Sequence, residues 1–438
     1  MPLGLISFIF FAIFAILNQI PDIMNRIITF VALICIALAS VATTRKAIYI
    51  VVDGVTADNI ERMRPPVIFD IARHGHYSRA YCGGKVGQYS ETPTISAIGY
   101  TNILTGTWLN KHNVNGNSNL KPNYNYWTIF RIAKEQKRNV TTALFSSWTD
   151  NRTVLLGEGK PETGQLKIDY VRDGYDLDTL RFPHREHDLH IFDIDAEVCR
   201  QAAQCVRADA PDLSWVYLWY TDDAYHMFGD SKFSDEYVMK TDSLIGQIWE
   251  AVQYRQKHYD EQWMVIVLTD HGRDEYGYDH GGQSLRARTT WVATNVKKVN
   301  RQFAYPELSH VDINPSICSF MGFEVPRELE FERDGTSFIG RRDIYGLTSS
   351  NYEDTITLSW KCDEARGNVD VYMSATNHYA EGGHDDWQRV ATVAASDGSC
   401  TVDISRYPDT PVFKFAVVSA HNTLTIWNPR HPGRKVRP

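Results

Sequence analysis

Between residues 47 and 340 the chain repeats one pattern, in which a short run that is apolar throughout is followed by a longer segment with helical periodicity. Uniformly apolar runs predict strands buried on both faces, because a strand with one solvent-facing side alternates apolar and polar residues. Alternation with helices predicts parallel pairing, and therefore an α/β domain with a mainly parallel sheet flanked by helices. The expected strands are residues 47–52, 140–145, 215–220, 264–269 and 290–294, and the expected helices are 60–74, 96–104, 126–136, 195–208, 235–254 and 311–321.

The pattern changes after Ile344. From Thr355 onward, short segments of alternating apolar and polar residues are separated by turns containing Gly, Asp or Pro. This is typical of a small all-β sandwich, which we expect to be fibronectin III-like. A chain of 438 residues is long enough for two or three domains. We place the α/β domain at 43–346 and the sandwich at 351–430.

The amino-terminal 42 residues are apolar twice, at 3–20 and at 27–42. From Met24 onward a basic start, an apolar middle and small residues follow one another, which is typical of a signal peptide and makes Met24 a candidate true start. A membrane anchor or helical hairpin is the alternative. In both cases we expect the folded part outside the cytoplasm, either secreted, periplasmic or at the cell surface.

The cysteine count agrees with export, because removal of Cys35 with a signal peptide leaves an even number. Local spacing favours two disulfides, and the remaining two cysteines make a third. Six cysteines permit 15 connectivities, and among these local spacing favours Cys199–Cys205 and Cys362–Cys400, which leaves Cys82–Cys318.

The net charge of −8 argues against binding to a nucleic-acid duplex, which needs dense Lys and Arg patches. A small anionic substrate remains compatible with this charge, since metal ions can hold one phosphate locally. The sequence does not indicate an oligomeric state.

Seven side chains that can bind metal ions occur in four short clusters, each at or just after an apolar run or at the start of an expected helix. They are Asp53, Ser96, Asp222 and His226, and Asp270, His271 and His280. The carboxyl ends of parallel strands meet at one edge of a sheet, where such side chains can converge. We therefore expect a two-metal hydrolase site.

The spacing within these clusters indicates how the side chains could act. Asp222 and His226 are four residues apart, so one helical turn places both on one face, with Asp223 as a rival carboxylate. Ser96 opens an expected helix, where a bound metal ion could turn its hydroxyl into a nucleophile. The alternative is a helix N-cap, a role that Thr94 could fill equally well.

These motifs, in this order, resemble the alkaline phosphatase superfamily, and most closely its type I phosphodiesterase and nucleotide pyrophosphatase branch. The resemblance covers residues 47–340. The aspartate after the first strand is Asp53, and the nucleophile position is Ser96 in a helix that ends in Thr-Gly. The later family motifs are Asp-x-x-x-His-x-x-Gly at 222–229, Asp-His-Gly at 270–272, His-Gly at 280–281, and a closing helix and Gly-Thr-Ser end within 311–340.

The resemblance implies two divalent metal ions, most often zinc, and a role for each side chain. One ion would be held by Asp53, Ser96, Asp270 and His271, and the other by Asp222, His226 and His280. His310 competes with His280 for the last place. Asn117 matches the asparagine that holds a phosphate oxygen, together with a backbone amide near Ser96.

The resemblance also implies hydrolysis of phosphate diesters or nucleotide pyrophosphates through a phosphoseryl intermediate. Nucleotide-cleaving members have a threonine followed by Phe and Pro, whereas this chain reads Ser96-Ala97-Ile98. The same triplet lacks the Pro and Arg setting of a sulfatase. Candidate residues to stack a ring are Trp108, Tyr124, Trp127, Trp148 and Tyr225.

Two other functions stay open at this point. A phosphomonoesterase or phosphoryl transferase of the same superfamily would be favoured by an arginine that clamps the phosphate. An inert surface-binding protein would not need to retain two zinc ions.

Overall fold

The computed structural model describes residues 43–363 and 366–429. The predicted signal peptide or membrane anchor, with the candidate start Met24, lies outside these residues. Among the residues described, no helix has both the length and the apolar character needed to cross a membrane.

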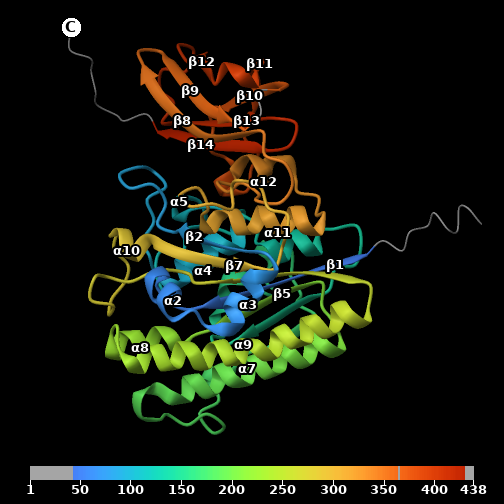
Figure 1. Ribbon diagram of the computed structural model, residues 1–438. Coiled ribbons are helices and arrows are strands. Elements are labelled where there is room, and N and C mark those ends of the chain that lie inside the picture. The colour runs from blue at the N-terminus through green and yellow to red at the C-terminus, as the bar shows by residue number, and fades with distance from the viewer. Residues whose placement is uncertain (1–42, 364–365, 430–438) are drawn as a thin grey trace, which may run out of the picture. The chain divides into compact units, whose positions relative to one another are not determined.

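A large, mainly parallel sheet forms the centre of the α/β part (Figure 1). Within the described residues it has seven strands in the order β2-β7-β6-β1-β5-β3-β4. The neighbours β1, β5, β3 and β4 are parallel, whereas β7 pairs antiparallel with both β2 and β6. The bounds are β1 Thr44–Val52, β2 His76–Tyr81, β3 Thr142–Ser146, β4 Tyr170–Arg172, β5 Leu213–Leu218, β6 Glu261–Leu268 and β7 Thr289–Thr294.

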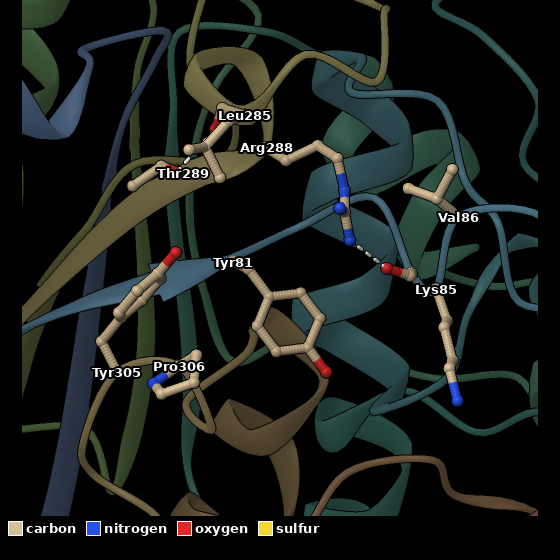
Figure 2. A pocket seen from close by; sticks show the side chains of 9 residues that line it. Tyr81, Lys85, Val86, Leu285, Arg288, Thr289, Tyr305 and Pro306 are labelled. Atoms are coloured by element: carbon tan, nitrogen blue, oxygen red, sulfur yellow. Dashed lines mark hydrogen bonds between the residues drawn. The ribbon is translucent and has the colours of Figure 1, made fainter.

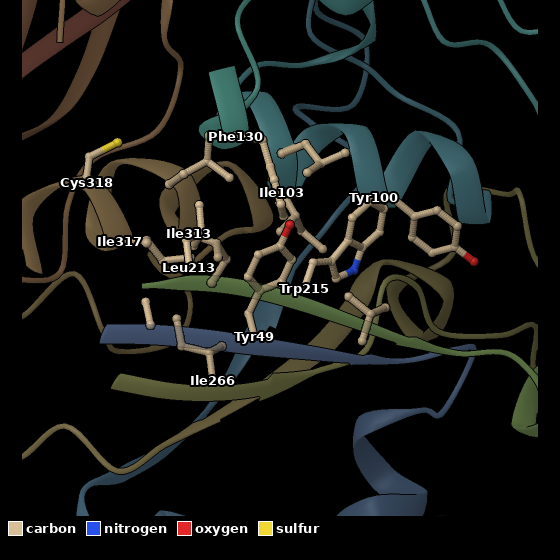
Figure 3. Packing of buried hydrophobic residues seen from close by; sticks show 14 of the residues in the cluster. Tyr49, Tyr100, Ile103, Phe130, Leu213, Trp215, Ile266, Ile313, Ile317 and Cys318 are labelled. Carbon is tan, nitrogen blue, oxygen red and sulfur yellow. The ribbon is translucent and has the colours of Figure 1, made fainter. Parts of the chain in front are cut away.

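Both faces of this sheet are buried, as the uniformly apolar runs predict. Alternate residues of β1 point to opposite faces, so Tyr49 and Ile50 belong to different hydrophobic clusters. Figure 3 shows Tyr49 and Trp215 of the sheet packed against α4, and their rings stack at 5.9 Å. The first cluster includes α4 Ser96–Thr105, α6 Ile129–Lys134 and α11 Ile313–Met321, and the second includes α2 Ala57–Met63, α3 Pro66–His74, α7 Leu189–Ala208, α8 Tyr220–Phe228 and α9 Lys232–His258.

Several element bounds differ from the prediction for local reasons. The expected helix 60–74 is two helices, because Arg64 takes a left-handed conformation with φ 49° and Pro66 begins the second one. The expected strand 215–220 ends at Leu218, and α8 begins two residues later at Tyr220. Strand β2, with the sequence HYSRAY, has no apolar run that could predict it.

The C-terminal part consists of two antiparallel sheets, with the strand orders β12-β9-β8 and β11-β10-β13-β14. Their facing sides enclose a separate core that includes Trp360, Phe413 and Phe415. The boundaries 43–346 and 351–430 stay predictions, although the first strand of these sheets already begins at Ile344. The bounds are β8 Ile344–Tyr352, β9 Thr355–Cys362, β10 Asn368–Ser374, β11 Gln388–Ala394, β12 Ser399–Asp403, β13 Val412–Val418 and β14 Thr423–Pro429.

Buried charges connect these sheets to the α/β part. The ammonium group of Lys414 in β13 donates to Glu332 Oε1 and Asp385 Oδ2, both at 2.6 Å, and all three side chains are almost fully buried. Glu332 ends α12 Arg327–Glu332. In addition, the backbone N–H of Trp427 donates to the hydroxyl of Tyr89 at 3.0 Å. The two parts therefore share hydrogen-bonded contacts.

The predicted disulfides are not formed, because all six described cysteines are free thiols: Cys82, Cys199, Cys205, Cys318, Cys362 and Cys400. Cys199 and Cys205 both lie in α7. Six residues of helix separate them by about 9 Å, beyond the roughly 7 Å that a disulfide spans. Cys400 pairs with Leu358 of β9, four residues and about 13 Å of strand away from Cys362. Cys82 and Cys318, the third predicted pair, are likewise free.

Candidate metal centre

The fold brings all seven predicted ligands to one edge of the central sheet. Asp53 follows β1 directly, α8 follows β5, and Asp270 and His271 follow β6. Ser96 is the first residue of α4, and His280 lies in the loop between β6 and α10 Leu285–Arg288. Side chains that are as much as 227 positions apart in the chain, from Asp53 to His280, thus meet where strands end.

The side chains predicted to surround the nucleophile gather around one ring nitrogen of His271. His271 Nε2 lies 3.1 Å from Ser96 Oγ, 3.3 Å from Asp270 Oδ2 and 3.4 Å from Asp53 Oδ1. Asp53, Asp270 and His271 form one of the groups whose ligand atoms lie close enough to hold a metal ion. All four residues are buried.

The other three predicted ligands lie beside this group. His226 Nε2 lies 3.3 Å from Asp222 Oδ2 and 3.1 Å from His280 Nε2. The imidazole of His280 stacks on that of His271 with ring centroids 3.8 Å apart. Asp222 Oδ1 lies 3.8 Å from His280 Nε2 and 4.0 Å from His271 Nε2. Asp222, His271 and His280 form the second group whose ligand atoms lie close enough to hold an ion, and His226 borders this group through Asp222 and His280.

The donor set fits divalent cations. Asp53 Oδ1 and Asp270 Oδ2 are buried and have no hydrogen-bond partner among the described residues. An unpartnered buried carboxylate oxygen is costly unless a cation satisfies it. Imidazole nitrogens and carboxylate oxygens are ligands that zinc accepts.

The carboxylates and imidazoles shift one another's pKa values. Burial and the charge of Asp53 raise the pKa of Asp270 well above its usual range. Burial lowers the pKa of His271, but the carboxylates of Asp270 and Asp53 outweigh it and raise the pKa to about 9. Burial and the neighbouring charge of His271 lower the pKa of His280 to about 3. Metal binding would release protons from Asp270 and His271, since carboxylates and imidazoles bind metal ions in their deprotonated forms.

Ser96 is not a helix cap. The N-cap of α4 is Ile95, which makes no side-chain cap, and Ser96 already has a helical position. Thr94 is not the cap either, because its hydroxyl accepts from the N–H of Gly281 at 2.9 Å and donates to the carbonyl of Gly282 at 2.8 Å. Its carbonyl lies 2.9 Å from His280 Nδ1. Thr94 therefore ties the segment before Ser96 to the loop that carries His280.

A cavity of about 290 Å³ opens onto this centre, and Asn117 is part of its wall. Asn117 Oδ1 accepts from the backbone N–H of Ala97 at 2.9 Å, which leaves the amide NH₂ group as a donor. The residues that line the cavity are Asp53, Ser96, Tyr100, Asn117, Trp148, Tyr217, Trp219, Asp222 and Asp223. Of the predicted aromatic candidates only Trp148 is in this set, whereas Trp219 lines it without having been predicted.

Asp223, the rival carboxylate, lines the cavity but does not belong to either ligand group. Its Oδ1 accepts from the indole N–H of Trp219 at 3.1 Å. Burial, together with the charge of Asp222, raises the pKa of Asp223 to about 8.

Two tyrosines that the sequence interpretation missed hold Asp53 in place. The Tyr217 hydroxyl donates to Asp53 Oδ2 at 2.6 Å, and the Tyr100 hydroxyl donates to the same oxygen. The two hydroxyls lie 2.8 Å apart. Tyr100 stands four residues after Ser96, on the same face of α4, which is the one signal that could have identified it.

Arg273 was also missed, although it follows the Asp-His-Gly motif directly. Its guanidinium is fully buried and donates to Asp222 Oδ1, to the carbonyl of Gly54 at 2.8 Å and to that of Tyr278 at 2.7 Å. Gly54 has φ +64°, and a Cβ there would lie 2.3 Å from Arg273 Nη2, so the arginine needs this glycine. These contacts commit Arg273 to Asp222 rather than to a phosphate in the cavity.

His310 does not belong to either ligand group. It is fully buried, and neither ring nitrogen has a hydrogen-bond partner among the described residues. Burial lowers the pKa of His310 to about 3, so its imidazole is neutral. The structure places His280 rather than His310 beside Asp222 and His226.

A second cavity, of about 440 Å³, lies elsewhere on the α/β part (Figure 2). Tyr81, Tyr305 and Pro306 form part of its wall, and the Arg288 guanidinium donates to the carbonyl of Gly84. None of the predicted site residues lines it. It is therefore separate from the candidate metal centre.

Solved structures with similar folds include hydrolases of several kinds. Phosphonoacetate hydrolase from Sinorhizobium meliloti 1021, in complex with phosphonoformate, matches at 16% identity and a TM-score of 0.38, over 52% of this chain and 57% of that one. Murine ectonucleotide pyrophosphatase / phosphodiesterase 5, inactive and in complex with AMP, matches at 13% identity and a TM-score of 0.43, over 64% of this chain and 96% of that one. A putative sulfatase from Bacteroides thetaiotaomicron VPI-5482 matches at 12% identity and a TM-score of 0.45, over 83% of this chain and 86% of that one. TM-scores this low do not indicate a function for this chain.

No curated protein matches the chain. The sequence model of one family, described as type I phosphodiesterase / nucleotide pyrophosphatase, matches residues 47–286, which is more than half of the 438 residues. This stretch contains all seven candidate ligands and Asn117. The chain belongs to the type I phosphodiesterase / nucleotide pyrophosphatase family and is a hydrolase.

Proposed function

We propose that the protein hydrolyses phosphate diesters or nucleotide pyrophosphates through a phosphoseryl intermediate at a two-zinc site. The observation that carries this proposal is the position of Ser96, whose Oγ lies 3.1 Å from His271 Nε2 in a group with two unpartnered carboxylate oxygens. A hydroxyl in this setting is available as a nucleophile once a metal ion lowers its pKa.

Each side chain has a separate role in this proposal. Two zinc ions, when bound, would supply positive charge to the attacking and the leaving oxygen. The first would be held by Asp53, Ser96, Asp270 and His271, and the second by Asp222, His226 and His280. Asn117 donates from its amide NH₂ group to a non-bridging phosphate oxygen. A backbone amide near Ser96 would hold the same oxygen, while the backbone N–H of Ala97 donates to Asn117 Oδ1 in this structure.

The composition of the cavity favours a diester over a monoester. A monoesterase that binds a dianionic phosphate would benefit from an arginine clamp, but the described residues that line the cavity include neither arginine nor lysine. Trp148 and Trp219 instead offer apolar faces to the ester substituent. We therefore retain the diesterase assignment over a phosphomonoesterase or phosphoryl transferase.

We also propose that the C-terminal sheets form a fibronectin III-like domain. Their first, second and fifth strands form one sheet, and their third, fourth, sixth and seventh form the other.

We also propose that the protein is exported through its amino-terminal apolar segment, to the cell surface, the periplasm or the medium. Secretion of a reporter fused to residues 1–46 tests that part.

The decisive experiment compares turnover of a bis-aryl phosphate diester and of the matching monoester. Wild type, Ser96→Ala and the control Ser243→Ala, an exposed serine in α9, are assayed with and without a chelator. We expect diester turnover to be lost in Ser96→Ala and after chelation, and to be unchanged in Ser243→Ala. Diester turnover that survives both treatments would falsify the mechanism, and higher efficiency on the monoester would replace the diesterase assignment.

A further inference from the structure

We propose that His184, Asp188 and His190 form a third, mononuclear site for a late first-row divalent ion, with zinc as the expected occupant. One ligand atom from each residue lies within 4.8 Å of the other two. Among the described residues this is the one such group besides the two at the sheet edge. The proposed function does not use any of the three residues.

The ligand chemistry suits zinc. Two imidazoles and one carboxylate are a common three-residue set, and a water molecule completes four-fold coordination. With metal–ligand distances of about 2.0–2.1 Å, tetrahedral ligand atoms lie about 3.4 Å apart, so the side chains need to close by on the order of 1 Å. His184 and Asp188 are exposed and can turn to do so.

His190 supplies a second reason to expect a cation. It is 94% buried, with 6% of its surface exposed, and its Nδ1 has no hydrogen-bond partner among the described residues. The imidazole of His184 packs edge-on against it, with ring centroids 4.5 Å apart. Two imidazoles brought this close, one of them with an unsatisfied nitrogen, would be stabilised by a shared ion.

The backbone that holds the three residues is fixed from the other side. His187 and Asp188 both have left-handed conformations, with φ 55° and 50°. The ring of His187 packs against Phe228 and Phe233, and its carbonyl accepts from the Tyr220 hydroxyl at 2.8 Å. This turn therefore has its shape before any ion binds, which lowers the entropic cost of assembling the site.

A bound ion would fasten the segment before α7 to the first turn of α7, which carries His190. In that segment Tyr175 and Phe182 pack against each other, whereas Leu177 and Leu180 are 72% and 96% exposed. Tyr220 and Phe228, which hold the turn, are the two ends of α8, and the same helix carries Asp222 and His226. The third ion would thus steady the outer support of the candidate metal centre without contacting substrate.

The test measures zinc content and protease protection on the full-length protein. The variants are His184→Ala and Asp188→Asn, since asparagine also tolerates a left-handed backbone. The control is His74→Ala, an exposed histidine of α3. Zinc per chain is determined after dialysis against zinc-free buffer, and circular dichroism checks that each variant folds. Trypsin cleavage after the half-exposed Arg181 and Arg185 is followed with added zinc and with chelator.

We expect wild type and His74→Ala to retain one zinc ion more than His184→Ala or Asp188→Asn. Zinc at ten times its dissociation constant should slow cleavage at the two arginines about tenfold in wild type and the control but not in the variants. Equal zinc content in all four proteins overturns the proposal, whatever the protease result. Loss of the additional ion from wild type on dialysis also overturns it.

Discussion

The side-chain oxygen of Asn117 accepts a hydrogen bond of 2.9 Å from the backbone N–H of Ala97, the residue after the proposed nucleophile. This bond fixes which end of the amide faces the cavity, because the oxygen is already engaged. Asn117 and Ser96 line the same cavity, so the NH₂ group is available there as a donor before a substrate arrives. Preorganised donors of this kind stabilise charge that develops in a transition state.

The first prediction concerns this amide. Asn117→Asp keeps an oxygen for Ala97 but removes the donor, and Asn117→Ala removes both. We expect each change to lower kcat for a diester by on the order of 10²–10³-fold. Single-turnover kinetics with saturating diester measure the effect. If Asn117→Asp retained the wild-type kcat, the donor role would be wrong.

The second prediction uses two buried tyrosines that differ in one contact. The Tyr217 hydroxyl donates to Asp53 Oδ2 at 2.6 Å, whereas the Tyr49 hydroxyl has no hydrogen-bond partner among the described residues. Tyr217→Phe should weaken zinc affinity about 10–100-fold, since partners of a ligand orient it. Tyr49→Phe should leave the affinity unchanged. Competition with a chromophoric chelator gives both values, and equal affinities would exclude an orienting role for Tyr217.

The third prediction concerns pH and Asp195. Its carboxylate accepts from the backbone N–H groups of Trp219 and Tyr220, at 3.0 and 2.8 Å, where α8 begins. Burial raises its pKa from 3.8 to about 7, against the opposing effect of these donors and of Ser147. Because the folded-state pKa is the higher one, the stabilising contribution is complete below pH 3.8 and is lost as pH rises through 7.

Asp195→Asn cannot titrate and should lack this contribution. The free energy of unfolding of wild type, relative to Asp195→Asn, should therefore fall by about 2–3 kcal/mol between pH 5 and pH 8. Urea denaturation at the two pH values measures it. Asp193→Asn, an exposed carboxylate of the same helix, is the control. A relative stability that is flat or rises with pH would contradict the assignment.

The fourth prediction compares two ion pairs of the C-terminal sheets. Lys414 is 1% exposed and pairs with two buried carboxylates, whereas Arg389 is 59% exposed and lies 3.5 Å from Asp370. Lys414→Met should destabilise the protein by about 3–5 kcal/mol, because it leaves buried carboxylates without a cation. Arg389→Met should cost less than about 1 kcal/mol. Thermal and denaturant unfolding measure the free energy of unfolding of both variants. Equal losses in the two variants would show that burial does not strengthen the Lys414 ion pairs.

The α/β order was predictable because buried parallel strands are apolar on both faces. That signal is absent from β2, an edge strand that pairs antiparallel with β7 and has polar residues at most positions. It also could not separate β5 from α8, since apolar residues continue through Trp219 and Tyr220 into the helix. The predicted disulfide pairs were wrong for a different reason. The number of residues between two cysteines does not reveal how far apart a helix or a strand pairing places them.

The convergence of the seven candidate ligands at the sheet edge could be predicted because each stands in a short motif at a strand or helix end. The side chains that orient them have no such motif. Tyr100 and Tyr217 converge on Asp53 from different elements, and Arg273 reaches Asp222 across 51 positions of sequence. Contacts of this kind depend on how strands are ordered in the sheet, which the sequence pattern left open.

Trp427 of β14 donates its backbone N–H to Tyr89, which lies in the loop that leads to α4, the helix that begins with Ser96. Lys414 reaches from β13 to the end of α12 in the same way. A gene shortened near residue 346 would encode an α/β part whose loop before α4 has lost an anchor and whose Glu332 has lost its cation. Exchange of the sandwich for another one would therefore require matching changes around Tyr89 and Glu332.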